Sequence, residues 1–244
     1  MKKITIVQIS DIHCCSSYFD SELMRTTVEQ VNQLKPDILI ISGDLTAEGF
    51  LHEYEVAVEQ IKRFNVERKL IVPGNHDARN VGYRIFERLI GNPFPTIKMA
   101  NELIVCGADS TEPDLNEGKI GRHWTMKLKQ RFSEDFDFKI MVLHHHVISV
   151  PNCGREMNIL QDAGDVLKMA AKSGVDMILS GHKHIPWLWN MEGMKILTCS
   201  TTTTKRVRGF HKPSYNIIEL TADKLKIYRQ EVLGARVEVF NGQR

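Results

Sequence analysis

The chain contains 244 residues, of which 42% are apolar and 25% are charged, and its formal net charge is +2 at pH 7. A chain of this length can form one domain with a large core or two small domains. The net charge creates no strong overall field that would attract nucleic acid or an anionic membrane. No apolar run approaches the ~20 residues of a membrane span. We therefore expect a globular protein with no membrane partner, and nucleic acid is not favoured as a partner.

The N-terminal segment and the cysteines bear on the cellular compartment. The apolar run at residues 4–10 is interrupted by Gln8 and Ser10, which indicates a strand rather than a signal peptide. The chain has five scattered cysteines and no C-x-x-C pair: Cys14, Cys15, Cys106, Cys153 and Cys199. An odd number of dispersed cysteines is typical of reduced thiols. We therefore expect a cytoplasmic protein.

Short apolar runs rich in Ile and Val recur along the chain, and each ends in a polar cluster. They predict strands at residues 4–10, 37–42, 69–73, 102–108, 139–143 and 176–180. Helical spacing of apolar residues predicts helices at 21–34, 50–64 and 160–173. The first helix ends before Pro36 and the third before Gly174. The alternation of strand and helix over residues 1–75 indicates parallel strands with crossover helices.

After about residue 190 the apolar pattern changes to a two-residue alternation. It predicts strands at residues 194–204, 214–220, 224–233 and 235–240. This part resembles an antiparallel meander. No linker, internal repeat or low-complexity segment divides the chain. We therefore predict an α/β fold in which residues 1–244 form a single domain with two packed sheets.

Polar side chains follow five of the predicted strands at the point where each strand ends. They are Asp11, His13, Asp44, Asn75, His144, His182 and His184. Ligands of open α/β sheets bind beyond the carboxyl ends of the strands, so we expect these side chains to meet in one cavity. Within D-x-H and H-x-H the two side chains point to one side if the chain stays extended. Gly43, Gly74 and Gly181 permit sharp turns before three of these groups.

This mixture of carboxylate, amide and imidazole groups suits divalent or trivalent ions such as Mn, Fe, Zn, Ni or Co better than Ca or Mg. The number of groups exceeds what one ion requires. If one carboxylate bridges two ions, each ion gains a full set of protein ligands, and water completes the coordination. Two ions ~3.5–4 Å apart can hold a hydroxide and clamp a phosphoryl group during displacement. We therefore predict two metal ions, with Mn or Fe favoured.

The order of the motifs resembles that of a known enzyme family. D-x-H, G-D, G-N-H-D, a histidine after a strand and G-H-x-H occur in this order between residues 11 and 184, as in the calcineurin-like metallophosphoesterase family. GDLTAEGFLHEYE, and GADST followed by GKIG, resemble the class III cyclic-nucleotide phosphodiesterase branch. The resemblance implies a four-layer αββα sandwich of two mixed sheets flanked by helices.

The resemblance also implies a role for each site residue. The ligands of the first metal would be Asp11, His13, Asp44 and His184, and those of the second would be Asp44, Asn75, His144 and His182. Asp44 would bridge the ions, His76 would contact the phosphate or the leaving group, and Asp77 would orient His76. The branch usually has His-His-Pro-Pro where this chain has a run of three histidines followed by valine. Either His144 or His145 therefore aligns with the ligand, and His144 is preferred.

The sequence thus predicts a dinuclear metal-dependent phosphoesterase. It would hydrolyse a phosphodiester or phosphomonoester of a small molecule, with a cyclic nucleotide as one option, by attack of a metal-bound hydroxide. A nuclease of the same fold is an alternative, but no DNA-handling insertion or strongly basic face is evident. A non-catalytic scaffold is another, but its ligand set would be eroded. Loops 112–123, 150–158 and 205–212 would select the substrate, and the basic run within 205–212 is either a solvated loop or an attractor of anionic substrate.

Overall fold

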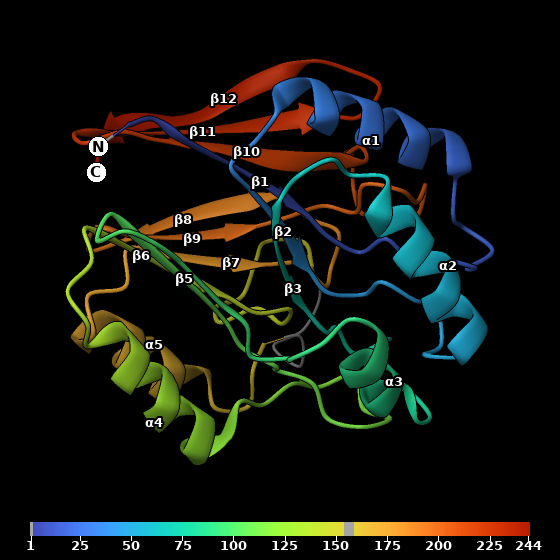
Figure 1. Cartoon of the computed structure of the whole chain (residues 1–244), viewed down its shortest axis with the longest axis horizontal. Helices are drawn as coiled ribbons and strands as arrows, with labels where there is room; N and C mark the ends of the chain where they lie inside the picture. Colours follow the sequence, from blue (N-terminus) through green and yellow to red (C-terminus); the bar gives the residue numbers. More distant parts are fainter. Residues whose placement is uncertain (1, 154–158) are drawn as a thin grey trace.

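Residues 2–153 and 159–244, which the computed structural model describes, form two β-sheets that pack face to face (Figure 1). The first sheet contains β1 (Ile4–Ile9), β2 (Ile38–Ser42), β3 (Arg68–Val72), β10 (Ser214–Leu220), β11 (Lys224–Glu231) and β12 (Arg236–Gln243). Its strand order is β12-β11-β10-β1-β2-β3. The three N-terminal strands are parallel, as predicted, and the three C-terminal strands form an antiparallel meander beside β1.

The second sheet is also mixed. It contains β4 (Thr96–Met99), β5 (Leu103–Gly107), β6 (Phe138–Val142), β7 (Met177–Ser180), β8 (Trp187–Met191) and β9 (Met194–Thr198) in the order β4-β5-β6-β7-β9-β8. The edge strands β4 and β8 are antiparallel to their neighbours, and the inner strands are parallel. The prediction that residues 194–204 belong to the C-terminal meander is wrong, because β9 ends at Thr198 and lies between β7 and β8.

Helices cover the outer face of each sheet (Figure 1). They are α1 (Ser21–Leu34), α2 (Leu51–Lys62) and α3 (Gly82–Leu89) on the first sheet, and α4 (Gly121–Phe132) and α5 (Ala163–Lys172) on the second. One apolar cluster lies between the sheets, where Ile40 of the first sheet packs near Val105 of the second. Two others lie beneath the helices. The predicted αββα sandwich is therefore confirmed.

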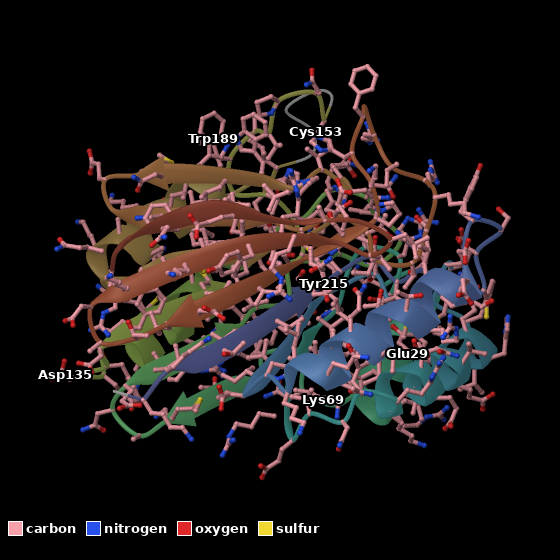
Figure 2. All side chains as sticks on the ribbon, turned by 90° about the horizontal axis from the view of Figure 1, so that it is seen from above. Glu29, Lys69, Asp135, Cys153, Trp189 and Tyr215 are labelled. Atoms are coloured by element: carbon pink, nitrogen blue, oxygen red, sulfur yellow. The ribbon has the colours of Figure 1, made fainter. Side chains whose placement is uncertain are left out.

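The first helix shows how local sequence fixes an element. Asp20 caps α1 by accepting hydrogen bonds from the backbone amides of Glu22 and Leu23 at 2.9 and 3.1 Å. Tyr215 of β10 is buried beneath α1, and its hydroxyl donates to Gln30 at 3.2 Å. Figure 2 shows Tyr215 between α1 and the sheet, with Glu29 on the outer side of α1. Burying one large apolar side chain contributes about 1.5–3 kcal/mol, so this packing holds α1 in place.

The sequence did not predict α3, α4, β4 or β8. Each lies at the surface, and only a few of its side chains are buried: in α4 these are Leu128 and Phe132, and β4 has none. A weak apolar pattern carries little periodic signal. No helix in residues 2–153 and 159–244 combines the length and apolar character needed to cross a membrane. Residues 154–158 of the predicted selectivity loop lie outside the described residues.

Candidate metal centre

The seven side chains predicted as metal ligands meet beyond the carboxyl ends of strands from both sheets. They come from the segments after β1 (Asp11 and His13), β2 (Asp44), β3 (Asn75), β6 (His144) and β7 (His182 and His184). None of the seven is more than 9% exposed. Burial of charged and polar groups is costly unless they are paired or bind a metal. The cluster is therefore stabilised by pairing among its own groups or by a bound cation.

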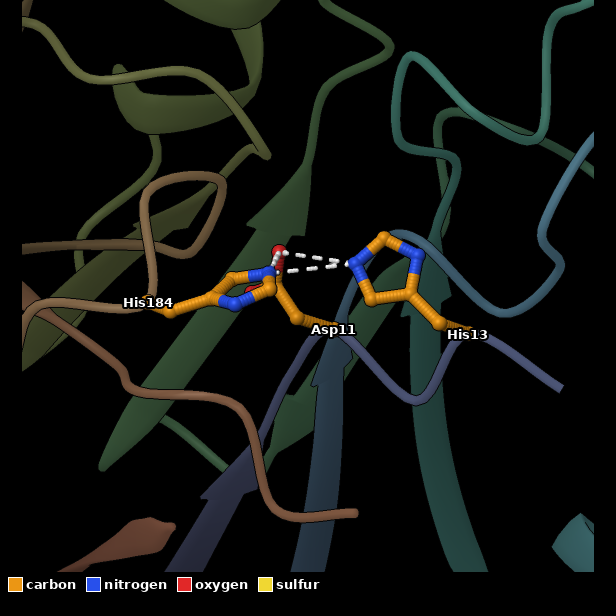
Figure 3. Close-up of side chains that lie close together, drawn as sticks. All are labelled: Asp11, His13 and His184. Carbon is orange, nitrogen blue, oxygen red and sulfur yellow. Dashed lines mark hydrogen bonds and ion pairs between the residues drawn. The ribbon is translucent and has the colours of Figure 1, made fainter. Parts of the chain in front are cut away.

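Asp11, His13 and His184 form the first part of the cluster. The Nε2 atom of His184 lies 3.3 Å from Oδ1 of Asp11 and 3.1 Å from Nε2 of His13. Figure 3 shows the two imidazoles approaching the Asp11 carboxylate from opposite sides. The Nε2 atom of His13 also lies 3.7 Å from Oδ2 of Asp44. Ring nitrogens that converge on two carboxylates form a donor set for a cation.

Asp44, Asn75, His144 and His182 form the second part. The Oδ1 atom of Asn75 lies 3.2 Å from Nε2 of His144 and 3.0 Å from Nδ1 of His182. The Nε2 atom of His144 lies 3.3 Å from Oδ2 of Asp44. Asp44 therefore contacts imidazoles of both parts through the same oxygen. A carboxylate in this position fits the bridging role that the sequence implied.

The donor chemistry fits transition metals. Carboxylate, amide oxygen and imidazole nitrogen face one another within hydrogen-bonding distance, and each offers a lone pair. Imidazole suits Zn, Fe, Ni and similar ions, whereas Ca and Mg prefer oxygen alone. The residues thus fit the metals expected from the sequence.

Burial and neighbouring charge set the protonation of these groups. Burial lowers the pKa of His13 to about 4 and that of His182 well below its ordinary value. Burial acts to raise the pKa of Asp44, but the adjacent His144 holds it well below its usual range. Burial acts to lower the pKa of His144, but Asp44 raises it to about 9. Asp44 is therefore ionised, and His13 and His182 are neutral, which are the forms that bind metals. The raised pKa of His144 shows that a positive charge next to Asp44 is stabilised.

Five of the seven residues have a backbone conformation that is rare outside glycine. The φ angles are 55° at Asp11, 50° at His13, 55° at Asp44, 80° at His182 and 57° at His184. The expectation of extended D-x-H and H-x-H segments is therefore wrong, and the side chains converge through left-handed turns instead. Each such residue costs roughly 1–3 kcal/mol and persists where the surrounding structure enforces it, which is typical of functional sites.

The histidine run after β6 separates into different environments. The Nε2 atom of His144 faces Asn75 and Asp44, as described above. His145 instead contacts Ser110 Oγ through Nδ1 at 2.9 Å and the Asn116 carbonyl through Nε2 at 3.2 Å. Both nitrogens of His145 are therefore occupied outside the cluster. This geometry favours His144 over His145 as the ligand.

His76 lies at the edge of the cluster, close to His13 and Asp44. Its Nδ1 atom contacts the Ala47 carbonyl at 2.5 Å. The Asp77 carboxylate instead accepts hydrogen bonds from backbone amides of the neighbouring loops and from the hydroxyl of Thr46. Among the described residues Asp77 makes no hydrogen bond to His76. The ring expected to be oriented by Asp77 is thus held by Ala47, and Asp77 ties the loop after β2 to the loop after β3.

Several supporting residues were not predicted from the sequence. The Asn75 amide donates to Asn116 Oδ1 at 3.3 Å, which turns the Asn75 oxygen toward the histidines. Thr201 donates to the Asp11 carbonyl at 2.7 Å and Thr203 to the Ile12 carbonyl at 2.6 Å. Residues 199–204, which were predicted to continue the strand, therefore form a buried loop that holds the turn containing Asp11 and His13. A run of threonines was the only sequence signal for it.

Gly74 provides a test of how tightly the loops pack. A Cβ atom at this position would overlap the carboxylate and the backbone nitrogen of Asp44. We expect Gly74→Ala to lower the free energy of unfolding by about 1–3 kcal/mol and to weaken metal binding, because Asp44 must shift. Thermal unfolding and metal titration measure both effects. Gly164→Ala in α5 is the matched control, because its Cβ meets no atom within 4 Å. An equal response of the two variants would contradict the proposed crowding.

Comparison with known proteins agrees with the family that the motif order indicates. A sequence profile described as calcineurin-like phosphoesterase matches residues 4–186. The chain belongs to this family. It is a metal-dependent phosphoric ester hydrolase by that membership, and the structure contains groups of His and Asp side chains that could hold a metal ion.

Relatives within the family agree with the branch expected from the sequence. A probable cyclic nucleotide phosphodiesterase of Ruthia magnifica is 25% identical over 236 residues, covering 91% of this chain and 98% of that protein. Another of Vesicomyosocius okutanii is 22% identical over 205 residues, covering 81% and 86%. A purple acid phosphatase from yellow lupin (Lupinus luteus) seeds has a similar fold, with a TM-score of 0.79 at 13% identity. The superposition covers all of this chain and 54% of that longer one.

Proposed function

We propose that residues 1–244 act as a single domain that hydrolyses a phosphodiester of a small molecule by means of two metal ions. Asp11, His13, Asp44 and His184 would hold one ion, and Asp44, Asn75, His144 and His182 the other. The observation that carries the proposal is the position of Asp44, which faces His13 at 3.7 Å and His144 at 3.3 Å through one oxygen. When bound, such a metal pair lowers the pKa of a water molecule and neutralises phosphate charge.

The protein's own residues supply orientation and proton transfer. The His76 ring is half-buried, lines the cavity above the cluster and contacts the Ala47 carbonyl through Nδ1. A protonated Nε2 on this ring would donate a proton to the leaving alcohol oxygen. The amide of Asn75 is held by Asn116, so its oxygen stays directed at the histidines. The names of the relatives favour a diester substrate, with a cyclic nucleotide as one option.

Replacement of His76 tests the proton-transfer role. We expect His76→Ala to lower kcat by about 10²–10⁴-fold on an alkyl phosphodiester, because general acid catalysis contributes that much. The loss should be much smaller on bis-p-nitrophenyl phosphate, whose leaving group needs no proton. Steady-state kinetics on both esters, with metal content measured by elemental analysis, would check this.

The exposed His52 of α2 offers a matched control for the His76 experiment. His52→Ala should leave both rates unchanged. An equal loss of activity of the His76 variant on the two esters would contradict proton donation, and a loss of bound metal would make His76 a ligand instead.

The proposed function itself is tested by hydrolysis. Protein of known metal content is offered bis-p-nitrophenyl phosphate, p-nitrophenyl phosphate, cyclic nucleotides, glycerophosphodiesters and short DNA. We expect Mn- or Fe-dependent turnover of diesters in preference to monoesters. Metal-loaded protein that hydrolyses none of them would refute the proposal.

A further inference from the structure

The cavity above the metal cluster carries cations that the proposed metal chemistry does not use. Its volume is about 740 Å³, and its basic lining residues are Arg79, Lys183, Arg206 and Arg208. Arg79 is paired, because its Nη1 donates to Glu48 at 2.7 Å. Lys183, Arg206 and Arg208 form no ion pair within the described part of the chain. Arg208 donates to the Cys153 carbonyl at 3.3 Å, and the Arg206 guanidinium lies 5.4 Å from the centre of the Tyr18 ring. Glu48 and Glu117 also line the cavity, but no carboxylate of the described residues lies within ion-pair distance of these three residues, which we call the cation triad.

Neighbouring cations of the same segment behave differently. Lys205 forms an ion pair with Asp20 at 2.7 Å, and Lys212 forms one with Glu231 at 3.0 Å. Neither lines the cavity. In the segment 205–212, the two lysines outside the cavity form ion pairs, whereas Arg206 and Arg208, which line the cavity, form none with the described residues.

Three unpaired cations around one cavity repel one another, and this cost is offset when an anion lies between them. The scissile group does not supply that anion. A phosphodiester carries a single negative charge, and the proposed metal ions face it directly. A further anionic group of the substrate would give the triad a partner.

We propose that Lys183, Arg206 and Arg208 bind a second phosphate group, so that the preferred substrates are phosphodiesters whose alcohol arm carries a further phosphate. This inference rests on the proposed function, because it assigns a substrate class to the same site. Arginine suits the role, since its planar guanidinium donates paired hydrogen bonds to phosphate oxygens. Replacing the Arg206 side chain leaves intact the backbone carbonyl that His184 Nδ1 contacts at 2.5 Å.

Two esters that differ by one phosphate test the inference. Thymidine 5′-(p-nitrophenyl phosphate) and its 3′-phosphorylated form release the same leaving group from the same ester. We expect the 3′-phosphorylated ester to have a kcat/KM at least about tenfold higher, mainly through KM, because hydrogen bonds to charged groups contribute this much to binding. In Arg206→Gln/Arg208→Gln the ratio should fall to near one.

A matched double variant removes the same charge elsewhere. Lys205→Gln/Lys212→Gln changes the net charge equally but leaves the cavity lining intact, so it should keep the preference. Two results would overturn the inference: equal kcat/KM values of the two esters with the unmodified protein, or an equal fall of the ratio in both double variants. The second would assign the effect to overall charge.

Binding measurements separate this inference from the proposed function. Calorimetry compares thymidine 3′,5′-bisphosphate with thymidine 5′-phosphate on metal-loaded protein. We expect the bisphosphate to bind at least about tenfold more tightly, and Arg206→Gln/Arg208→Gln to remove the difference. If neither ester is hydrolysed, the proposed function is wrong. The ratio of the affinities for the bisphosphate and the monophosphate would still show whether the cation triad binds a second phosphate. Equal affinities would refute the cation triad as a phosphate site even in an active enzyme.

Discussion

Asp44→Asn is expected to lower kcat/KM by at least about 1,000-fold and to reduce the metal content of the protein. The carboxylate faces His13 and His144 through one oxygen, so loss of its charge weakens both parts of the cluster at once. Several kcal/mol of charge stabilisation would be lost, and each 1.36 kcal/mol corresponds to a factor of ten in rate. The backbone amide of His76 donates a hydrogen bond to Asp44 Oδ1 at 2.9 Å. The side-chain oxygen of asparagine can accept the same hydrogen bond, so the fold should persist.

Elemental analysis and kinetics on bis-p-nitrophenyl phosphate would measure these effects. Asp109→Asn serves as the control, since this half-buried carboxylate lies on the loop after β5, accepts hydrogen bonds from Thr111 and makes none to the cluster among the described residues. It should retain metal and activity. If the Asp44→Asn protein kept its metal and its activity, Asp44 would not be a metal ligand and the proposal that it bridges two ions would be wrong.

The strands and the positions of the polar groups could be predicted from sequence because both are local signals. The apolar run at residues 38–41 ends at Ser42, and Asp44 follows two residues later. Parallel strands bring such ends to one edge of a sheet. The expectation that all seven groups meet in one cavity came from their residue types and their positions at strand ends. That the ends belong to two different sheets does not follow from local pattern, and the resemblance to a family with the same motif order supplied the two-metal assignment.

The supporting contacts could not be predicted, because they join segments far apart in the chain. Thr201 holds the Asp11 carbonyl across 190 residues, and nothing near either residue signals the pairing. The left-handed turns at Asp11 and His182 were missed for a related reason. Local preference disfavours positive φ at such residues, and only the packing of the completed site enforces it. The identity of the site residues is therefore easier to predict from the sequence than the contacts that position them.

His144→Ala is expected to remove metal from the centre, whereas His145→Ala is expected to leave the metal content unchanged. Both side chains are fully buried, so both variants should lose stability to a similar degree. The His144 ring nitrogen faces Asn75 and Asp44, so its removal should release one of two ions and lower kcat/KM by at least about 100-fold. His145 is held by Ser110 and Asn116, so its variant should keep both ions and stay within about tenfold of the unmodified activity.

Metal stoichiometry is the decisive measurement, because it distinguishes lost ligation from lost stability. Thermal unfolding in the presence of a chelator would confirm that the two variants are comparably folded without metal. Release of an ion from His145→Ala but not from His144→Ala would exchange their roles and shift the ligand by one residue. Full metal content in both variants would mean that neither imidazole is a ligand, and the second metal position would then have to be built from Asp44, Asn75 and His182 alone.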